Sequence, residues 1–215
     1  MCKQEKLIYI ENYLKTYFDE MILEDLKKMR GSDLCFTIPY ILLVSAGIDF
    51  LGGLEKGFYK INKRGEKIGN SSERSRSFIK NWMGRVNTLY GEQWVAKVIY
   101  GAVRCGAVHQ AIFKKGVEAY SGVDFQDKHL YVRINPTSKE RVFIHALQFA
   151  DDFIKAQKIF REEYIKKDID DVHRRLAELL KGEMANLPDL IESLKKKGFV
   201  FSDEVVPSPS SAPEE

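Results

Sequence analysis

The chain has 215 residues, of which 44% are hydrophobic and 30% are charged, which is an ordinary composition for a globular protein. This length suits one domain with an appendage or two small domains, and it allows a sizeable buried core. The formal net charge of +3 is too small to indicate nucleic-acid binding by itself, so such a function would depend on a local patch of charge.

The three cysteines, Cys2, Cys35 and Cys105, are odd in number and have no zinc-finger spacing, which argues against a disulfide framework or a structural zinc site. The N-terminus carries no secretory signal pattern, so we expect a cytoplasmic protein in a reducing compartment. The most apolar segment, 38–54, is short and contains Asp49 and three glycines. We interpret it as a buried core helix and expect no contact with a membrane.

The first two predicted elements are helices. Residues 5–30 repeat apolar side chains at three- and four-residue steps, and Gly31 suits the cap that follows. Residues 38–56 are apolar almost all round, which predicts a helix at the centre of a bundle. The basic and polar segment from Gly57 to Asn70 is predicted to be a loop.

Two more helices are predicted before the hydrophobic period changes. Ser71 and Ser72 can cap a third helix, which Gly91 interrupts. A fourth helical stretch begins at about Glu92 and leads to Phe113.

Beyond this point the pattern predicts a β-hairpin followed by further helices. Residues 129–134 and 142–144 alternate apolar and polar side chains on either side of an Asn-Pro turn. Helical periodicity returns over 146–164 and 168–180, and a short helix is predicted from Pro188. The fold class is thus mainly α, a helical bundle of four to five helices with a small β-hairpin. The predicted parts are a bundle over 1–165, a helical extension over 166–200 and a disordered tail over 201–215.

One segment has the residues for catalysis, namely Arg104 and His109, which lie five positions apart. In an ideal helix they would be separated by about 140° of rotation and would not share a face. The two side chains can converge if the backbone deviates near Gly106, or if a second copy of the chain supplies one of them.

An arginine and a histidine suffice for cleaving RNA without a metal. Histidine titrates near neutrality and can move a proton to or from the reacting oxygens. Arginine offers a permanent charge that stabilises the phosphate in the transition state. The RNA supplies its own nucleophile, the ribose 2′-hydroxyl.

An apolar helix, a loop and then a helix that carries Arg-x4-His together resemble the HEPN superfamily over residues 38–165. The resemblance implies a helical bundle acting as a metal-independent ribonuclease in a defence or toxin system, with no cofactor and no metal. It also implies a homodimer in which the motifs of two copies meet at the interface, RNA as the partner, and possible control by an antitoxin or regulatory protein.

Two other interpretations of this segment stay open. HEPN proteins commonly have a polar residue, often asparagine, directly after the arginine, where this chain has Cys105. Inactive members of the superfamily act as binding modules, so the alternative function is a non-catalytic helical binding or adaptor module. In an unrelated helical protein, Arg104 would pair with an acid and His109 would be a structural histidine.

Asp49 is the third candidate for the catalytic site. A carboxylate within an apolar helix is costly unless it is paired, and Asp49 could orient Arg104 or His109 as such a partner. The alternative is a structural salt bridge or a position at the end of the bundle.

Basic residues in and after the loop form a candidate RNA-binding surface, with aromatic side chains interleaved. The residues expected to contact RNA are Lys60, Lys63, Arg64, Lys67 and Arg74. The alternative for this segment is an ordinary solvated loop.

Two further groups resemble metal sites at first sight. His129 and His145 lie on the two predicted strands, but two histidines alone rarely bind a metal. The second group is Asp168, Asp170, Asp171 and His173. We interpret it as the charged start of a solvated helix, where acids suit the helix dipole.

Overall fold

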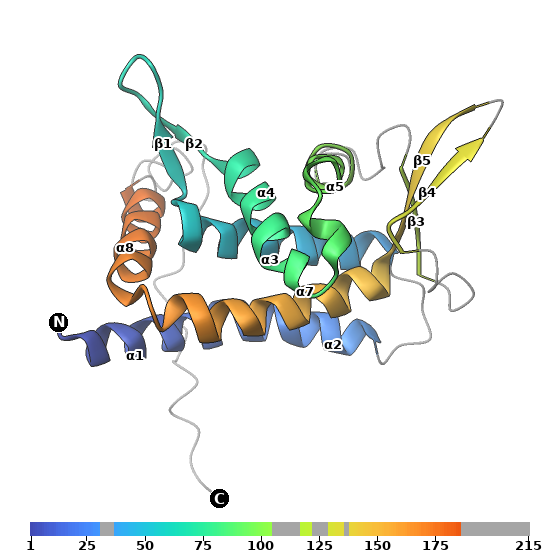
Figure 1. Ribbon diagram of the computed structural model, residues 1–215. Coiled ribbons are helices and arrows are strands. Elements are labelled where there is room, and N and C mark those ends of the chain that lie inside the picture. Colours follow the sequence, from blue (N-terminus) through green and yellow to red (C-terminus); the bar gives the residue numbers. More distant parts are fainter. Residues whose placement is uncertain (31–36, 105–116, 122–128, 136–137, 186–215) are drawn as a thin grey trace, which may run out of the picture. The chain divides into compact units, whose positions relative to one another are not determined.

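The computed structural model describes residues 1–30, 37–104, 117–121, 129–135 and 138–185 (Figure 1). The fold is mainly α, a helical bundle with a small β-hairpin, and this confirms the predicted fold class. The α-helices are α1 (Lys3–Tyr13), α2 (Glu24–Arg30), α3 (Thr37–Lys56), α4 (Ser71–Asn81), α5 (Gln93–Val98), α7 (Ala146–Phe160) and α8 (Ile169–Ala185).

Shorter helical stretches extend or join these helices. The π-helical stretches are η1 (Leu14–Leu23), which joins α1 to α2, η4 (Ile99–Arg104), which continues α5, and η6 (Arg161–Ile165), which continues α7. Two 3₁₀ turns, η2 (Met83–Arg85) and η3 (Thr88–Gly91), connect α4 to α5. The predicted helix over 5–30 is therefore one continuous helical segment, from Lys3 to Arg30.

The described strands form two small sheets. Strands β1 (Tyr59–Ile61) and β2 (Lys67–Gly69) pair antiparallel. Strands β3 (Val117–Tyr120), β4 (Tyr131–Asn135) and β5 (Ser138–His145) form a sheet in the order β3-β5-β4, with β3 parallel to β5. The predicted β4–β5 hairpin is confirmed. The prediction of a plain loop over 57–70 is wrong, because the β1–β2 hairpin lies within it.

The core is built around α3, which packs against both α4 and α7. Gly47 of α3 faces the ring of Phe153 so closely that a Cβ at this position would overlap it. Phe153 lies 6.2 Å, between ring centroids, from both Phe18 and Phe78, and all three rings are buried. The absence of a side chain at Gly47 thus lets α7 place a large aromatic ring at the centre of the bundle.

Helix α3 is long and apolar enough to cross a membrane by length and composition alone. Many of its apolar side chains are buried within the protein, as the sequence predicted for a core helix. The fully or almost fully buried ones include Tyr40, Ile41, Val44, Ile48, Leu51 and Leu54.

Residues Met1–Leu176 form one compact unit, and a second begins at Ala177. Helix α8 begins at Ile169, so its first two turns belong to the first unit, which extends past the boundary predicted at residue 165. The helix predicted from Pro188 and the tail predicted from residue 201 lie outside the described residues.

Candidate functional site

Arg104 is the last residue of η4, at the end of the helical segment that begins with α5. This segment contacts α3 and α4, and it buries Ile99 and Val103 completely or almost completely. Its π-helical backbone departs from the spacing of an α-helix, and such departures are frequent at functional sites. Cys105 and His109 lie outside the described residues, so the predicted Arg104–His109 pairing stays a prediction.

Asp49 of α3 lies at the centre of a hydrogen-bonded cluster with α4. Its carboxylate accepts hydrogen bonds from Nε and Nη2 of Arg74, at 3.0 and 2.5 Å, and from the hydroxyls of Ser71 and Ser75, at 2.7 and 2.8 Å. Burial raises the pKa of Asp49, but the hydrogen bonds from Arg74 and Ser71 outweigh burial and hold that pKa below its usual value. Asp49 therefore has the structural salt bridge that was the alternative to a catalytic role.

Arg74 also fixes the base of the β1–β2 hairpin. Its Nη1 donates to the backbone carbonyl of Phe58 at 2.9 Å, while the other two donating nitrogens reach Asp49. Its side chain is only 14% exposed. The guanidinium of Arg74 is thus committed to contacts within the protein, and its predicted contact with RNA stays a prediction.

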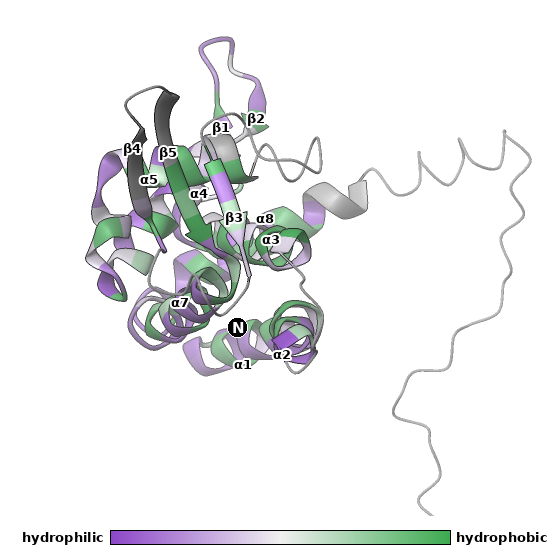
Figure 2. Cartoon of the chain, turned by 90° about the vertical axis from the view of Figure 1, so that its right-hand side faces the viewer, coloured by the Kyte–Doolittle hydropathy of each residue, from purple (hydrophilic) through white to green (hydrophobic). Residues whose placement is uncertain are grey.

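The remaining basic residues of the predicted RNA-binding surface lie on the β1–β2 hairpin, which projects beyond α3 and α4 (Figure 1). Lys60, Lys63, Arg64 and Lys67 are all exposed, and none of them forms an ion pair with another described residue. Figure 2 shows that the tip of the hairpin is hydrophilic. Its charges are therefore available to an anionic partner.

The hairpin tip has a defined conformation because Asn62 organises the turn. The Asn62 side-chain oxygen accepts from the backbone N–H groups of Arg64 and Glu66, both at 2.9 Å. Lys67 lies over the ring of Tyr59, with its amino nitrogen 4.4 Å from the ring centroid. A two-stranded hairpin is barely stable alone, so this turn and the Arg74 contact at the base keep it ordered.

A second polar cluster, which we call the histidine cluster, consists of Tyr90, His129, His145 and Asp152. Nε2 of His129 lies 2.6 Å from the Tyr90 hydroxyl and 3.7 Å from the Asp152 carboxylate. Nδ1 of His129 accepts from the backbone N–H of His145 at 3.1 Å. Because Nδ1 is an acceptor, the proton of the neutral ring is on Nε2, which then donates to Tyr90.

Burial decides the protonation of this cluster. The side chains of His129 and Asp152 are 4% and 3% exposed, and Tyr90 is fully buried. Burial, together with the nearby His145, lowers the pKa of His129 to about 3. Burial also raises the pKa of Asp152, and burial with the nearby Asp152 raises the pKa of Tyr90 well above its usual value.

The histidine cluster fastens the β4–β5 hairpin to the helices. His145 caps α7, since its Nδ1 accepts from the backbone N–H of Gln148 at 3.2 Å. The Nδ1 lone pairs of both histidines are therefore occupied by backbone donors. Among the described residues, no group of three or more histidine, cysteine or acidic side chains is arranged to hold a metal.

The sequence analysis singled out the two histidines but missed Tyr90 and Asp152. The burial of Asp152 could have been predicted from the sequence, because Asp152 lies three residues after Phe149 and therefore on the same, buried face of α7. The acidic group at the start of α8 is confirmed as a charged helix face: Asp170 binds Lys6 at 2.7 Å, and Asp171 binds Arg174 at 3.0 Å.

No family model matches this chain, and neither a curated protein nor a solved structure is significantly similar to it. Any function must therefore be inferred from the chain's own residues and their positions. The features that bear on function are the position of Arg104, the exposed hairpin and the charges around them.

Proposed function

We propose that the protein is a HEPN-like, metal-independent RNA endonuclease that works as a homodimer. Arg104 would bind the phosphate, and His109 would be the general acid or base. The observation that carries this proposal is the position of Arg104, at the end of the helical segment α5–η4. This segment packs against the apolar helix α3, and the two follow one another in the order on which the HEPN resemblance depends.

The proposed reaction uses only groups of the RNA and the protein. His109 of one copy accepts the proton of the ribose 2′-hydroxyl while the 2′-oxygen attacks the phosphorus. The bond from phosphorus to the 5′-oxygen breaks, and the leaving oxygen takes a proton from His109 of the second copy. The products are a 2′,3′-cyclic phosphate and a free 5′-hydroxyl, and Arg104 stabilises the charge that develops on the phosphate.

The β1–β2 hairpin supplies the proposed contact with the RNA backbone. Its four exposed basic side chains, with Tyr59 beside them, match the cationic surface and neighbouring aromatic that single-stranded RNA needs. We place the protein in the cytoplasm, in a defence or toxin system, where an antitoxin or regulatory protein would restrain it.

The deciding experiment is cleavage of single-stranded RNA in EDTA. We expect His109→Ala to lower the cleavage rate by about 10² to 10⁴-fold, because it removes the proton-transfer group. Arg104→Ala is expected to lower it similarly, through lost stabilisation of the phosphate. His173→Ala is the matched control, since it removes a partly exposed histidine of α8 and should leave the rate unchanged. Equal cleavage by wild type and His109→Ala, or no cleavage by either, would refute the proposed ribonuclease activity.

The second candidate is a non-catalytic binding module, and the observation that favours it is Cys105, which stands where HEPN proteins often have asparagine. A module of this kind binds RNA in the same assay but leaves it intact. Cys105→Asn separates the two functions further. If the enzyme is limited by this position, the substitution should raise its cleavage rate, whereas a binding module stays inactive.

A further inference from the structure

Three aromatic rings lie side by side across the sheet β3-β5-β4, one from each strand. Phe143 of β5 is in the middle, and its ring centroid lies 5.7 Å from that of Tyr120 on β3 and 6.2 Å from that of Tyr131 on β4. The ring planes of Tyr120 and Phe143 differ by only 9°, so these two rings are stacked. The three rings form a continuous row on one face of the sheet, which we call the aromatic row.

The face of the sheet that carries the aromatic row is open to solvent at Tyr131. Val142 and Ile144, the neighbours of Phe143 in β5, lie on the opposite face because side chains alternate along a strand. Both are buried, and β5 contacts α7. Tyr131, in contrast, is 54% exposed, and its strand β4 is at the edge of the sheet. Figure 1 shows the β4–β5 hairpin extending from the start of α7.

Two arginines occupy the next pair of positions along this face. The register pairs Tyr131 with Phe143 and, two residues further along each strand, Arg133 of β4 with Arg141 of β5. The alternation of side chains therefore places both arginines on the face of the aromatic row. Like charges at directly opposite positions destabilise an antiparallel pair of strands. An anion bound by both arginines would remove this repulsion.

Positive charge is in excess on this part of the face. Within residues 117–120, 131–133 and 141–145, the face carries one acidic residue, Glu118, which has the register position of Phe143 on β3. Glu118 accepts a hydrogen bond from the Tyr120 hydroxyl, and the two arginines outnumber it. Aromatic rings beside an excess of arginine suit single-stranded nucleic acid, because bases stack on the rings and phosphates bind the guanidinium groups.

We propose that this sheet face binds single-stranded RNA. A base stacks on the exposed ring of Tyr131, and a neighbouring phosphate is bound by Arg133 and Arg141. The choice of RNA as the ligand rests on the proposed function, whereas the aromatic row and the arginine pair are observed independently of it. The face is a contact with RNA additional to the β1–β2 hairpin, and it takes part in binding and not in the cleavage step.

Fluorescence anisotropy with a labelled 2′-O-methyl oligoadenylate of about 12 nucleotides tests this face. The probe lacks the free 2′-hydroxyl that the proposed cleavage uses, so binding is measured without catalysis. Tyr131→Leu keeps an apolar side chain but removes the ring, and it should weaken binding by about 10-fold. Tyr131→Phe keeps the ring and should bind like wild type. Equal affinity of wild type and Tyr131→Leu, or no binding by wild type, would overturn the proposal.

A matched control and a second probe show whether a base is recognised. Tyr17→Leu removes a tyrosine of η1 that is 55% exposed, and it should bind like wild type. An abasic form of the oligonucleotide should bind wild type about 10-fold more weakly, because it cannot stack, and should bind Tyr131→Leu about as well as the complete probe does. A polyglutamate peptide that binds wild type as tightly as the oligonucleotide would overturn the proposal, since charge alone would then be recognised.

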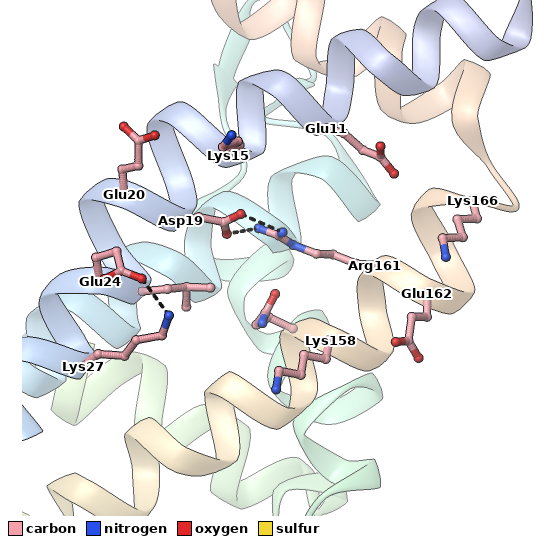
Figure 3. A pocket seen from close by; sticks show the side chains of 12 residues that line it. Glu11, Lys15, Asp19, Glu20, Glu24, Lys27, Lys158, Arg161, Glu162 and Lys166 are labelled. Atoms are coloured by element: carbon pink, nitrogen blue, oxygen red, sulfur yellow. Dashed lines mark hydrogen bonds and ion pairs between the residues drawn. The ribbon is translucent and has the colours of Figure 1, made fainter. Parts of the chain in front are cut away.

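The arginine pair is tested by the dependence of binding on salt. Arg133→Gln and Arg141→Gln should each lower the logarithmic slope by about 0.7, through the loss of one phosphate contact. Lys158→Gln is the control, because Lys158 is exposed and lines a cleft between η1 and α7 whose lining has five acidic and five basic side chains (Figure 3). It should leave the slope unchanged. An unchanged slope in both arginine variants would contradict the proposed phosphate contact.

Thermal unfolding separates lost binding from lost folding. Tyr131→Leu alters an exposed side chain, so it should melt close to the temperature of wild type. If it melts much lower, the comparison of the complete and abasic probes on wild type decides, and equal affinity for the two overturns the proposal. RNA that binds through Tyr131 without being cleaved would refute only the ribonuclease. Cleavage by a protein in which Tyr131→Leu leaves binding unchanged would refute only this face.

Discussion

The β1–β2 hairpin and the histidine cluster are both rich in polar groups, but the charged side chains of the hairpin are exposed to solvent, whereas the polar side chains of the cluster are buried. Lys63 and Arg64 at the hairpin tip are exposed and carry no ion pair with described residues. The side chains of Tyr90, His129 and Asp152 are almost completely buried. The pKa of Tyr90 and of Asp152 is raised and that of His129 is lowered, and each of these shifts favours the neutral form. The exposed charges can attract a partner, whereas burial disfavours the charged forms of the cluster, whose contacts fix one arrangement of strands and helices.

The Asp49–Arg74 pair is a largely buried ion pair that anchors the base of the hairpin to α3, and breaking it should have the largest effect on stability. Arg74→Ala leaves the Asp49 carboxylate, which is 15% exposed, without its cation and releases the hairpin base from Phe58. We expect the free energy of unfolding to fall by about 3 kcal/mol, measured by urea denaturation.

A double-mutant cycle sharpens this expectation. Asp49→Ala combined with Arg74→Ala should cost much less than the sum of the two single changes, because neither charge is then left without its partner. If the two changes are simply additive, the pair contributes nothing specific to the fold, and the hairpin must be held by other contacts.

His129 should give the next largest effect, as a dependence of stability on pH. Its pKa is about 3 in the folded protein and about 6.5 in the unfolded chain, so between these values the unfolded chain binds more protons. Stability is therefore complete above about pH 6.5 and is lost as the pH falls. At pH 5 the contribution of His129 should be about 2 kcal/mol lower than at pH 7, as measured by urea denaturation at each pH.

Asp152 acts in the opposite direction, which makes a matched variant necessary. Burial raises its pKa in the folded protein, so its ionisation costs stability as the pH rises from its unfolded value of about 3.8 through the folded pKa. The difference between wild type and His129→Gln isolates the histidine. Parallel stability curves for the two proteins between pH 5 and 7 would show that His129 is not buried as a neutral ring.

The hairpin tip should give the smallest effect on stability and the clearest effect on binding. Lys63→Glu with Arg64→Glu should change the free energy of unfolding by less than about 0.5 kcal/mol, because both side chains are exposed. The same change should weaken RNA binding and flatten its dependence on salt, by about 0.7 in the logarithmic slope for each lost phosphate contact. Binding is measured by fluorescence anisotropy across a range of salt concentrations.

Lys97→Glu on α5 is the control for this charge reversal, since Lys97 is an exposed lysine outside the hairpin. It should leave the salt dependence close to that of wild type. An unchanged affinity for RNA in the hairpin variant would show that the hairpin is an ordinary solvated surface element.

Much of the helical fold followed from local patterns. The apolar residues of α3 predicted a helix at the centre of the bundle. The predicted start of α4 at Ser71 is confirmed, but the N-cap is Asn70 and not one of the two serines. Alternation with an Asn-Pro turn located the β4–β5 hairpin. These features could be predicted because burial of one helix face or one strand face leaves a regular period in the residues themselves.

The sequence by itself determined that the chain is a helical bundle with a basic segment between its second and third helices, because hydrophobic period and composition are local properties. Only the tertiary structure decided what the polar groups do. β1 and β2 have three residues each, too few to show a period. Arg74 is a structural residue because it contacts Asp49 and Phe58, and no local pattern separates it from the exposed Lys63. His129 meets Tyr90 and Asp152 from distant parts of the chain. Such pairings depend on long-range packing, so a surface charge and a structural one look alike in sequence.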